Sequence, residues 1–562
     1  MGRVFFIGRI LLCVLAIATV SLEAEVKNTE KEVMFYSDAR HSSVYLYEPP
    51  MSIRQYVEPI DELLDLGIDT ISYAVGDCSV LLYDTKVGER WGHNLDLVDH
   101  IVWYRAGQNA YSLMKRGMDP LAVVTKHANK RGFKFLPHLL LNMLHTPPSR
   151  VTSSRVANFT TQHPEWQVGP EPDYPAAVHD LPHRLSYARP EIRKDRLAVI
   201  RELVSDYPSD GIEINFHSYA PFIARREVAE HTQTMTNWIR EIREICNEAA
   251  VSQGRPKRLV IRIAGTLEGS RSVGMDLKHW IKKELVDTVI AMPVTHGYQG
   301  TTTELKKVVQ AAKGTKVSVL AGIKNTLDPT IQGNSQRDVY YAAAVNAYAA
   351  GAQGVLFHTY YPGSNRYPYD DAATTSLRLM GYPDVLAHKD KRFHIGLNPN
   401  RKTPPKYGVS MPPKYGVPWQ LPLKLSPGEI GQEIQLEIAD DVIGKVKAGE
   451  LWRCELRVVL QYLMHTDKFK LYWNGKEIAQ EKQRKADWTY QMRPRPENIR
   501  GYRIHVDLKG DDLPRIGTNT IRVDLLKKDA KLVMPVRVAD VEVVVEYLPG
   551  RNGLRDGEGG PG

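Results

Sequence analysis

The chain has 562 residues, of which 43% are hydrophobic and 25% are charged. This ordinary globular composition excludes a chain that is disordered throughout, and the length leaves room for two to four domains of about 100–200 residues each. The formal net charge is +9, and because Lys and Arg are interspersed with Asp and Glu, no nucleic-acid-binding tract is predicted. A mildly basic surface could attract an acidic glycan, although a solvated surface without that role is the simpler interpretation.

The N-terminus has the pattern of an export signal. Two arginines precede an apolar run at residues 10–18, and small residues follow it, with Ser21 and Ala24 as the expected cleavage points. The run is shorter than the roughly 20 residues that a membrane helix needs. We therefore expect a signal peptide at residues 1–24, a secreted or periplasmic mature protein, and no membrane association after cleavage. An uncleaved anchor is the alternative.

Three cysteines remain after cleavage, namely Cys78, Cys246 and Cys454. Their odd number and wide spacing predict neither a disulfide framework nor a cysteine metal cluster, although one pair could still form a bridge. We therefore expect the hydrophobic core to stabilise the fold.

Between residues 30 and 395, short apolar or β-branched runs alternate with helical stretches. Helical spacing of apolar residues predicts helices at 53–66, 120–131, 232–250 and 338–350. Eight strands are predicted, at 33–36, 67–75, 133–138, 211–216, 258–263, 286–292, 316–321 and 353–358. Strands that alternate with helices indicate a parallel sheet, and eight of them fit a (β/α)₈ barrel, or TIM barrel. A doubly wound open sheet is disfavoured because no Gly-x-Gly-x-x-Gly motif follows the first strand.

The composition changes near residue 395. Residues 396–425 are rich in Pro and Lys and contain Pro-Pro-Lys-Tyr-Gly-Val twice, which predicts an extended linker. Alternation of apolar and polar residues then predicts an all-β sandwich at 426–549, with an Asn474-Gly475 hairpin turn and no helix. Its strands are expected at 433–438, 454–462, 469–473, 502–508, 520–526 and 541–547. This domain could bind sugar or brace the barrel, and bracing is the simpler expectation. We expect the Gly-rich tail at 550–562 to be disordered.

The fourth predicted strand carries polar residues on its inward face. Because side chains alternate along a strand, three apolar residues should face the helices and three polar residues the barrel interior. The apolar set is Ile212, Ile214 and Phe216, and the polar set is Glu213, Asn215 and His217. A carboxylate and an amide inside a barrel are costly unless they are paired or used. Since active sites of these barrels lie at the carboxyl ends of the strands, this strand marks the candidate site.

The same segment resembles a known family. Asp210-Gly211-Ile212-Glu213-Ile214-Asn215 is similar to the Asp-Gly-x-Asp/Glu-x-Asp/Asn motif on the fourth strand of several TIM-barrel glycoside hydrolases. Tyr207-Pro208-Ser209-Asp210-Gly211 resembles the approach to that strand in the bacterial glycosyl-hydrolase-like family ten group. Segments 274–277 and 286–287, with Trp280 between them, resemble that group's helix into strand six. The resemblance covers residues 32–395 and implies a TIM-barrel protein that acts on a polysaccharide or oligosaccharide.

The candidate catalytic residues are carboxylates near the strand ends. Glycoside hydrolases normally use two carboxyl groups, about 5–5.5 Å apart in retaining enzymes and about 6.5–9.5 Å apart in inverting ones. Glu213 is the first candidate, and its expected partner is Glu268, after strand five, or else Asp38, after strand one. In chitinase-like barrels the fourth-strand motif ends in the proton-donating Glu, whereas this chain has His217 there. The end of strand seven, at 321–324, has no carboxylate either.

Other polar residues near strand ends are candidates for binding sugar hydroxyls or moving protons. They are His138, Asn142, Asn215, His217, Arg262, His296, His358 and Tyr360. Of these, Arg262 could also pair with Glu213. The aromatic candidates for stacking on a sugar ring are Trp103, Tyr298, Tyr360 and Tyr361, with ordinary packing as the equal alternative. No His-x-His or His-Glu-x-x-His spacing appears, so neither a metal nor a cofactor is predicted.

Two functions are consistent with these residues. The first is a glycoside hydrolase in which Glu213 acts together with Glu268 or Asp38. The second is a non-catalytic carbohydrate-binding protein on the same fold, which His217 and the missing strand-seven carboxylate favour. Both predict a carbohydrate ligand, and the sequence indicates no oligomeric state.

Overall fold

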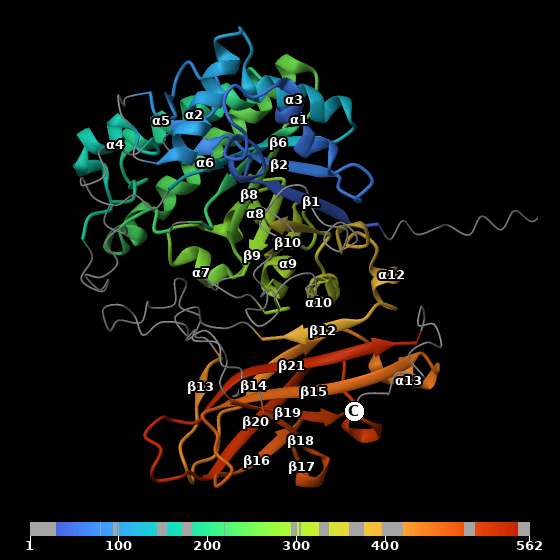
Figure 1. Ribbon diagram of the computed structural model, residues 1–562. Helices are drawn as coiled ribbons and strands as arrows, with labels where there is room; N and C mark the ends of the chain where they lie inside the picture. The colour runs from blue at the N-terminus through green and yellow to red at the C-terminus, as the bar shows by residue number, and fades with distance from the viewer. Residues whose placement is uncertain are drawn as a thin grey trace, which may run out of the picture.

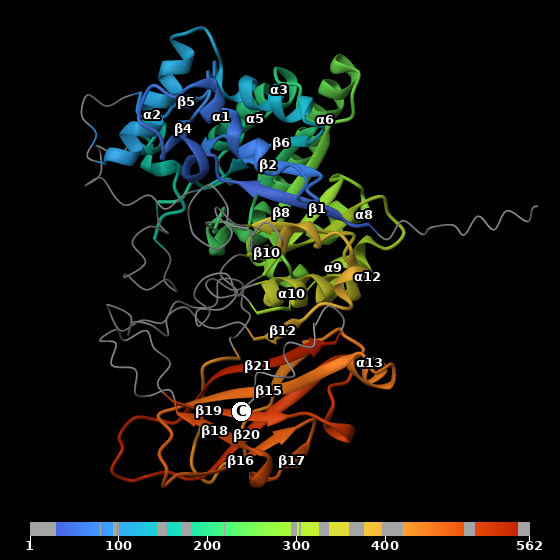
Figure 2. The same cartoon turned by 45° about the vertical axis from the view of Figure 1, so that its right-hand side comes forward.

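Two domains make up the described part of the chain (Figure 1, Figure 2). The computed structural model describes residues 30–78, 80–93, 98, 100–142, 154–170, 183–218, 220–293, 300–302, 305–324, 337–358, 376–395, 420–487 and 501–548. The predicted signal peptide, residues 396–419 of the predicted linker and the predicted tail lie outside these ranges. Figure 1 shows the barrel with its helices at one end of the molecule and the sheets that contain β15 and β20 at the other.

Eight parallel strands close into a barrel in the N-terminal domain. In the order in which they neighbour one another, they are β1 (Glu32–Ser37), β11 (Gly354–His358), β10 (Ser318–Lys324), β9 (Thr288–Met292), β8 (Arg258–Ala264), β7 (Gly211–Asn215), β6 (Lys134–Leu140) and β2 (Thr70–Ala74). The first strand pairs with both β11 and β2, which closes the barrel. Each predicted strand overlaps one of these strands, so the predicted (β/α)₈ architecture is confirmed.

Helices cover the outside of the barrel (Figure 1). They are α1 (Ile53–Asp61), α2 (Ile101–Met114), α3 (Pro120–Lys130), α4 (Asn158–Gln162), α5 (Pro190–Ser205), α6 (Val228–Gln253), α7 (Leu267–Arg271), α8 (Leu277–Lys282), α9 (Lys306–Ala312), α10 (Arg337–Ala349) and α12 (Pro383–Leu386). Shorter elements are the helical turns η1 (Arg40–Val44), η3 (Pro164–Trp166) and η4 (Arg225–Glu227), and a small sheet of β3 (Gly76–Asp77), β4 (Val80–Leu81) and β5 (Glu89–Arg90). The helix predicted at 53–66 is shorter than expected. It ends at Asp61, and the turns after it hold Asp65 and Gly67 at positive φ, which an α-helix does not accommodate.

The helix after β7, α6, follows from its pattern of apolar residues. Trp238, Ile242, Ile245 and Ala249 recur every three or four positions and are buried. The helix ends at Gly254, whose φ of 63° is left-handed and suits a residue without a Cβ atom. The buried face of α6 packs against the outer side of the strand that carries the candidate site. There Phe216, the residue after β7, contacts Trp238 edge-on.

Apolar side chains fill much of the barrel interior. The interior cluster consists of Met34, Tyr36, Ala74, Leu136, Val260, Ile290, Met292, Leu320 and Leu356. A much larger cluster runs between the strands and the surrounding helices and continues into the C-terminal domain, and Ile212, Ile214 and Phe216 belong to it. The predicted outward face of β7 is therefore confirmed, and Glu213 on the same strand points into the barrel, where it contacts Arg262.

Two antiparallel sheets form the C-terminal domain and confirm the predicted sandwich. One contains β12 (Lys391–His394), β21 (Arg537–Tyr547), β15 (Leu451–Gln461), β19 (Gly501–Asp507) and β18 (Arg484–Asp487), with β13 (Leu423–Lys424) beside β21. The other contains β14 (Ile434–Ile438), β20 (Gly517–Lys527), β16 (Lys468–Trp473) and β17 (Lys476–Ile478). The predicted Asn474-Gly475 turn joins β16 to β17, and both of its residues have positive φ, as a tight two-residue hairpin requires.

The expectation of no helix in the sandwich is wrong. A six-residue helix, α13 (Val442–Lys447), begins after Asp441, whose side chain accepts a hydrogen bond from the backbone of Gly444. A helix this short spans fewer than two turns, so it leaves no periodic apolar pattern in the sequence. The turns η7 (Gln480–Lys482) and η8 (Gly510–Asp512) are shorter still.

The sandwich packs directly against the barrel. Its edge strand β12 precedes the Pro-rich stretch in the sequence, lies beside α10 in both views, and pairs with β21 (Figure 1, Figure 2). Asn346 on α10 donates hydrogen bonds to the carbonyls of Thr301 and Glu437, at 3.1 and 3.0 Å, and accepts one from the backbone of Ala439 at 2.9 Å. This side chain ties the barrel to β14.

Candidate functional site

Six inward side chains meet near the carboxyl ends of the barrel strands. We refer to them as the interior polar cluster, which consists of Tyr36 on β1, His138 on β6, Glu213 on β7, Arg262 on β8, Lys324 on β10 and His358 on β11. Strand pairing places His358 beside both Tyr36 and Lys324, and places His138 beside Glu213. Five of them are buried, and His358 is half-buried. Residues far apart in the sequence therefore share one level of the barrel.

Glu213 is the centre of this cluster. Its Oε1 atom accepts a hydrogen bond from Nε of Arg262 at 2.5 Å, and it lies 3.2 Å from Nδ1 of His138. Its Oε2 atom is buried and has no hydrogen-bond partner among the described residues. The expected pair between Arg262 and Glu213 is thus present, and a buried oxygen without a partner is a feature that calls for an explanation.

The charges of the cluster follow from burial and from Arg262. Burial alone would raise the pKa of Glu213, but Arg262 and His138 hold that pKa well below its usual range. Burial lowers the pKa of His138, and burial together with Arg262 and Lys324 holds the pKa of His358 well below its usual range. Burial, followed by Arg262, lowers the pKa of Lys324 to about 8. At neutral pH the cluster therefore contains one carboxylate, two cations and two neutral imidazoles.

Tyr36 contacts both histidines and the arginine of the cluster. Its ring stacks on His358 with centroids 4.7 Å apart and meets His138 edge-on at 4.8 Å. The guanidinium carbon of Arg262 lies 4.6 Å from the centre of the same ring, and a second contact of Arg262 runs from Nη1 to Nδ1 of His358 at 2.8 Å. The tyrosine thus holds these side chains in fixed positions. It was not among the predicted site residues, although strand alternation places it inward.

Three of the predicted binding residues support the backbone around the cluster. Asn215 contacts Nε2 of His138 at 3.3 Å, and its Oδ1 atom accepts from the backbone of His217 at 2.9 Å. The Nε2 atom of His217, the residue that replaces the proton-donating Glu, donates to the carbonyl of Pro293 at 3.0 Å and so connects the end of β7 to the end of β9. Asn142 accepts from the backbone of Leu185 at 2.9 Å and ties two loops together.

The two predicted partners of Glu213 lie in different surroundings. Asp38 is buried, and both of its oxygens bind Arg40, at 2.9 and 2.8 Å, while His41 contacts it at 2.9 Å. Glu268 lies on α7 with 66% of its side chain exposed and forms an ion pair with Lys307 at 2.7 Å. The structure does not bring Glu268 into the interior polar cluster, because Thr266 caps a short helix there and turns the chain outward.

The first residues of the fourth-strand motif have a structural role at the opposite end of the strand. The side chain of Asp210 accepts a hydrogen bond from the backbone of Phe135 at 2.8 Å and pairs with Arg255. Gly211 has a φ of 139°, and a Cβ atom there would collide with the backbone of Arg258. The motif therefore fixes the pairing of β6, β7 and β8 below the candidate site.

Several predicted residues do not join the cluster or lie outside the described residues. His296, Tyr298, Tyr360 and Tyr361 are outside them. Trp103 lies on α2, where its ring stacks on His100 at 4.4 Å. Lys324 was missed by sequence reasoning, which searched this strand end for a carboxylate, although the alternation of side chains along the strand indicates its inward position.

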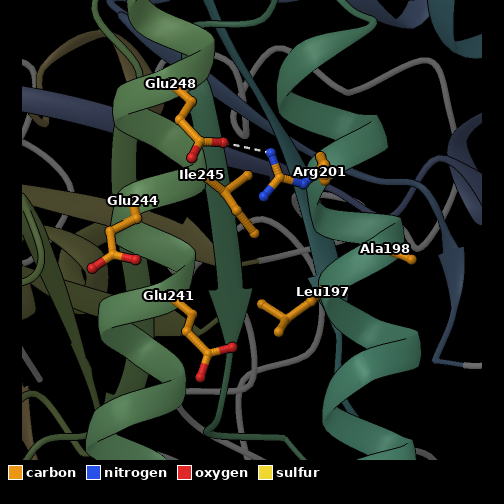
Figure 3. A pocket seen from close by; sticks show the side chains of 7 residues that line it. All are labelled: Leu197, Ala198, Arg201, Glu241, Glu244, Ile245 and Glu248. Atoms are coloured by element: carbon orange, nitrogen blue, oxygen red, sulfur yellow. Dashed lines mark hydrogen bonds and ion pairs between the residues drawn. The ribbon is translucent and has the colours of Figure 1, made fainter.

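A surface groove of about 350 Å³ lies between α5 and α6 (Figure 3); its lining residues are Leu197, Ala198, Arg201, Glu241, Glu244, Ile245 and Glu248. It shares no residue with the interior polar cluster. No group of three His, Cys, Asp or Glu side chains within the described ranges could hold a metal ion. None of the described helices combines the length and the hydropathy that crossing a bilayer requires.

Comparison with known proteins agrees with the resemblance inferred from the fourth strand. Residues 38–238, which include that strand, match the model of the family described as Glycosyl hydrolase-like 10. The resemblance to this family, expected for residues 32–395, is thereby confirmed for residues 38–238, and this part of the chain is glycoside hydrolase-like. No curated protein matches the sequence.

Solved structures share only limited similarity with the chain. An α-L-fucosidase, isoenzyme 2 from Paenibacillus thiaminolyticus, is 13% identical with a TM-score of 0.39, and the match covers 64% of this chain and 49% of the fucosidase. An α-amylase from Malbranchea cinnamomea is 12% identical with a TM-score of 0.36, over 64% of this chain and 77% of the amylase. The chain thus spans about half the length of the fucosidase. These values are too low to transfer an activity.

Proposed function

We propose that the carboxyl end of the barrel binds an oligosaccharide or polysaccharide and hydrolyses a glycosidic bond, with Glu213 as the anionic group below the bound sugar. One observation carries this proposal. Oε1 of Glu213 is held by Arg262 and His138, whereas Oε2 is buried without a hydrogen-bond partner among the described residues. The match of residues 38–238 to a glycosyl hydrolase-like family supports a carbohydrate as the ligand.

An ionised carboxylate suits the charge that develops during glycoside hydrolysis. The transition state resembles an oxocarbenium ion, which a carboxylate stabilises electrostatically. The same group can attack the anomeric carbon, which displaces the leaving-group oxygen and forms a glycosyl ester that water later cleaves. Both roles require the ionised form. Burial would raise the pKa of Glu213, but Arg262 and His138 lower that pKa by more than burial raises it. The carboxylate therefore stays ionised at neutral pH.

A second candidate function is carbohydrate binding without hydrolysis, and the surroundings of the other two carboxylates favour it. The pKa of Asp38 stays well below its usual range, because Arg40 and His41 outweigh the opposing effect of burial. Glu268 is exposed and paired with Lys307. A hydrolase needs a proton donor near the leaving-group oxygen. Neither carboxyl group has the surroundings of an acid that stays protonated at neutral pH.

The test is to measure both binding and turnover on a panel of glycans. We expect the wild-type protein to release reducing ends from at least one glycan and the Glu213→Gln variant to lose at least about 100-fold in rate. The matched control is Glu268→Gln, the same substitution at an exposed site, which should keep the wild-type rate. Because Glu213→Gln leaves Arg262 without its counter-charge, Glu213→Asp serves as a second variant that retains the charge but withdraws the oxygen atoms.

The outcomes of this test separate the two functions. Release of reducing ends that depends on Glu213 supports hydrolysis, and glycan binding without release supports the binding function. If no glycan binds, or if Glu213→Gln and Glu213→Asp both retain the wild-type rate and affinity, the assignment of the interior polar cluster as the site is wrong.

We also propose that the mature protein acts outside the cytoplasm. The support is the export-signal pattern of residues 1–24. N-terminal sequencing of the protein recovered from the medium or the periplasm should find a start just after Ser21 or Ala24. A protein that begins at Met1 and stays in the cytoplasmic fraction would contradict export.

A further inference from the structure

The side-chain amide of Asn215 has an orientation that the chain after β7 fixes. Its Oδ1 atom accepts hydrogen bonds from the backbone N–H groups of His217 and Ser218, each at 2.9 Å. Only the oxygen of an amide can accept such bonds, so the NH2 group must point the other way. There Nδ2 lies 3.1 Å from Oγ of Ser218 and 3.3 Å from Nε2 of His138. The end of β7 thus directs a fixed donor at one nitrogen of His138.

This donor decides which ring nitrogen of His138 carries the proton. Burial lowers the pKa of His138, and a neutral imidazole has one nitrogen that donates and one that accepts. Because Nδ2 of Asn215 donates, Nε2 of His138 must accept, and the proton therefore lies on Nδ1. Nδ1 lies 3.2 Å from Oε1 of Glu213, so the ring donates to the carboxylate. The contacts of the two ring nitrogens thus require the same tautomer.

The opposite tautomer fits the surroundings of the ring less well. With the proton on Nε2, an N–H group would face the NH2 group of Asn215, and the lone pair of Nδ1 would face the carboxylate of Glu213. In exchange Nδ1 could accept from Ser72 at 3.3 Å and from Arg262 at 3.4 Å, and both distances are long for hydrogen bonds. A hydrogen bond to an ionised carboxylate is stronger than these, and unfavourable polar contacts are costly in a buried site.

The tautomer of His138 has a consequence for the carboxylate of Glu213. Oε1 accepts from Nε of Arg262 at 2.5 Å as well as from Nδ1 of His138, so both donors lie on the same oxygen. The buried Oε2 atom has no hydrogen-bond partner among the described residues. Two donors on one oxygen fix the plane of the carboxyl group, and the loss of either would let it turn.

We infer that Asn215 is a positioning residue: by holding His138 in the Nδ1–H tautomer, it directs Oε1 of Glu213 away from the sugar and Oε2 toward it. This inference rests on the proposed function and deepens it, because it assigns the orientation of the acting carboxylate to a residue that does not touch the sugar. In this account His138 donates a hydrogen bond and stays neutral, so it is not the group that protonates the leaving-group oxygen.

Nuclear magnetic resonance of the protein labelled with nitrogen-15 histidine reads the tautomer directly. The ring signals of His138 are assigned by their absence from the spectrum of His138→Gln. In the wild-type protein at pH 7 we expect a protonated Nδ1 and an unprotonated Nε2. A proton on Nε2, or on both nitrogens, would overturn the inference.

Variants test whether Asn215 sets this tautomer. Asn215→Asp keeps an oxygen for the two backbone N–H groups but presents an acceptor to Nε2 of His138, so the ring should become protonated on both nitrogens. The matched control is Asn247→Asp, the same substitution at an exposed position of α6, which should leave the ring signals unchanged. Ser72→Ala removes the hydroxyl that would support the opposite tautomer, and it should also leave them unchanged. Unchanged signals in Asn215→Asp, or a displaced proton in Ser72→Ala, would contradict the assigned role.

Kinetics connect the tautomer to the reaction. Asn215→Leu has a similar size but cannot donate, so His138 is free to take the other tautomer and Glu213 loses one donor. On a glycan that the wild-type protein cleaves, kcat should fall about 10- to 100-fold, as expected for the loss of one hydrogen bond to a charged group. KM should stay within about twofold, because Asn215 does not contact the sugar. An unchanged kcat, or a fall in kcat without a change in the His138 signals, would leave Asn215 with a structural role only and overturn the inference.

The failure of this inference is distinguishable from the failure of the proposed function. If the protein cleaves a glycan in a Glu213-dependent way but the ring of His138 carries its proton on Nε2, the proposed function stands and the role of Asn215 is wrong. If no glycan is cleaved, the proposed hydrolysis fails, and the role of Asn215 in it fails as well, whichever nitrogen carries the proton.

Discussion

The ion pair at the centre of the barrel gives a prediction whose magnitude follows from burial. Glu213 and Arg262 both have fully buried side chains, and Nε of Arg262 lies 2.5 Å from Oε1 of Glu213. Arg262→Met would keep most of the apolar stem and remove the charge. The carboxylate would then remain in the barrel interior without its main counter-charge. Breaking a buried pair in this way costs about 3–5 kcal/mol of the free energy of unfolding at neutral pH.

The loss should depend on pH in a defined direction. In the wild-type protein the pKa of Glu213 lies below that of an unfolded Glu, about 4.3, so its contribution to stability is present above that value and is lost as the pH falls. In the variant, burial dominates and raises the pKa of Glu213, so lowering the pH neutralises the carboxyl group and relieves its cost. The stability difference between the wild-type protein and the variant should therefore be largest near pH 7 and shrink toward pH 4.

Urea titrations across this pH range measure the effect. The matched control is Arg201→Met, because Arg201 pairs with Glu248 at 2.5 Å on the surface groove between α5 and α6, where both side chains are more than half exposed (Figure 3). That substitution should change the free energy of unfolding by less than about 1 kcal/mol. If Arg262→Met costs no more than Arg201→Met, or if its cost does not vary with pH, the electrostatic account of the cluster is refuted.

Two further predictions test other parts of the structure. Gly211→Ala should lower the free energy of unfolding by about 1–3 kcal/mol, because its Cβ atom would collide with the backbone of Arg258. The control in the same urea titrations is Gly254→Ala, which should cost less because no atom lies within 4 Å of its Cβ position. Equal losses for the two variants would argue against the collision. Asn346→Ala removes the side chain whose hydrogen bonds join α10 to β14, and calorimetry should show that the free energy of unfolding falls by about 1–3 kcal/mol. An unchanged unfolding profile would show that these hydrogen bonds do not stabilise the protein.

The barrel was predictable because buried parallel strands are nearly continuous apolar runs. Each run could be recognised in the sequence as a strand, and eight such strands predicted the closed barrel that the structure shows. The edge strand β12 was harder to assign to the sandwich, since it has four residues and its partner strand lies beyond the Pro-rich stretch. Short elements whose partners are distant in the sequence carry little local signal.

The candidate site was predictable to the extent that it depends on strand alternation. Alternation placed Glu213 inward and suggested its pair with Arg262, and the structure shows that pair. The position of Glu268 depended instead on how the chain leaves β8, where the cap by Thr266 starts a helix that turns outward. Lys324 was overlooked because the end of strand seven was considered only as a source of a carboxylate, although a buried cation is as informative as a buried anion.

The initial rate of reducing-end release from the glycan panel at pH 7 tests the central claim most directly. We predict that the wild-type protein cleaves at least one glycan, that Glu213→Gln reduces this rate at least about 100-fold, and that Glu268→Gln leaves it unchanged. A rate that survives Glu213→Gln, or one that depends on Glu268 instead, would contradict the assignment of the barrel interior as the place where the protein acts on its sugar.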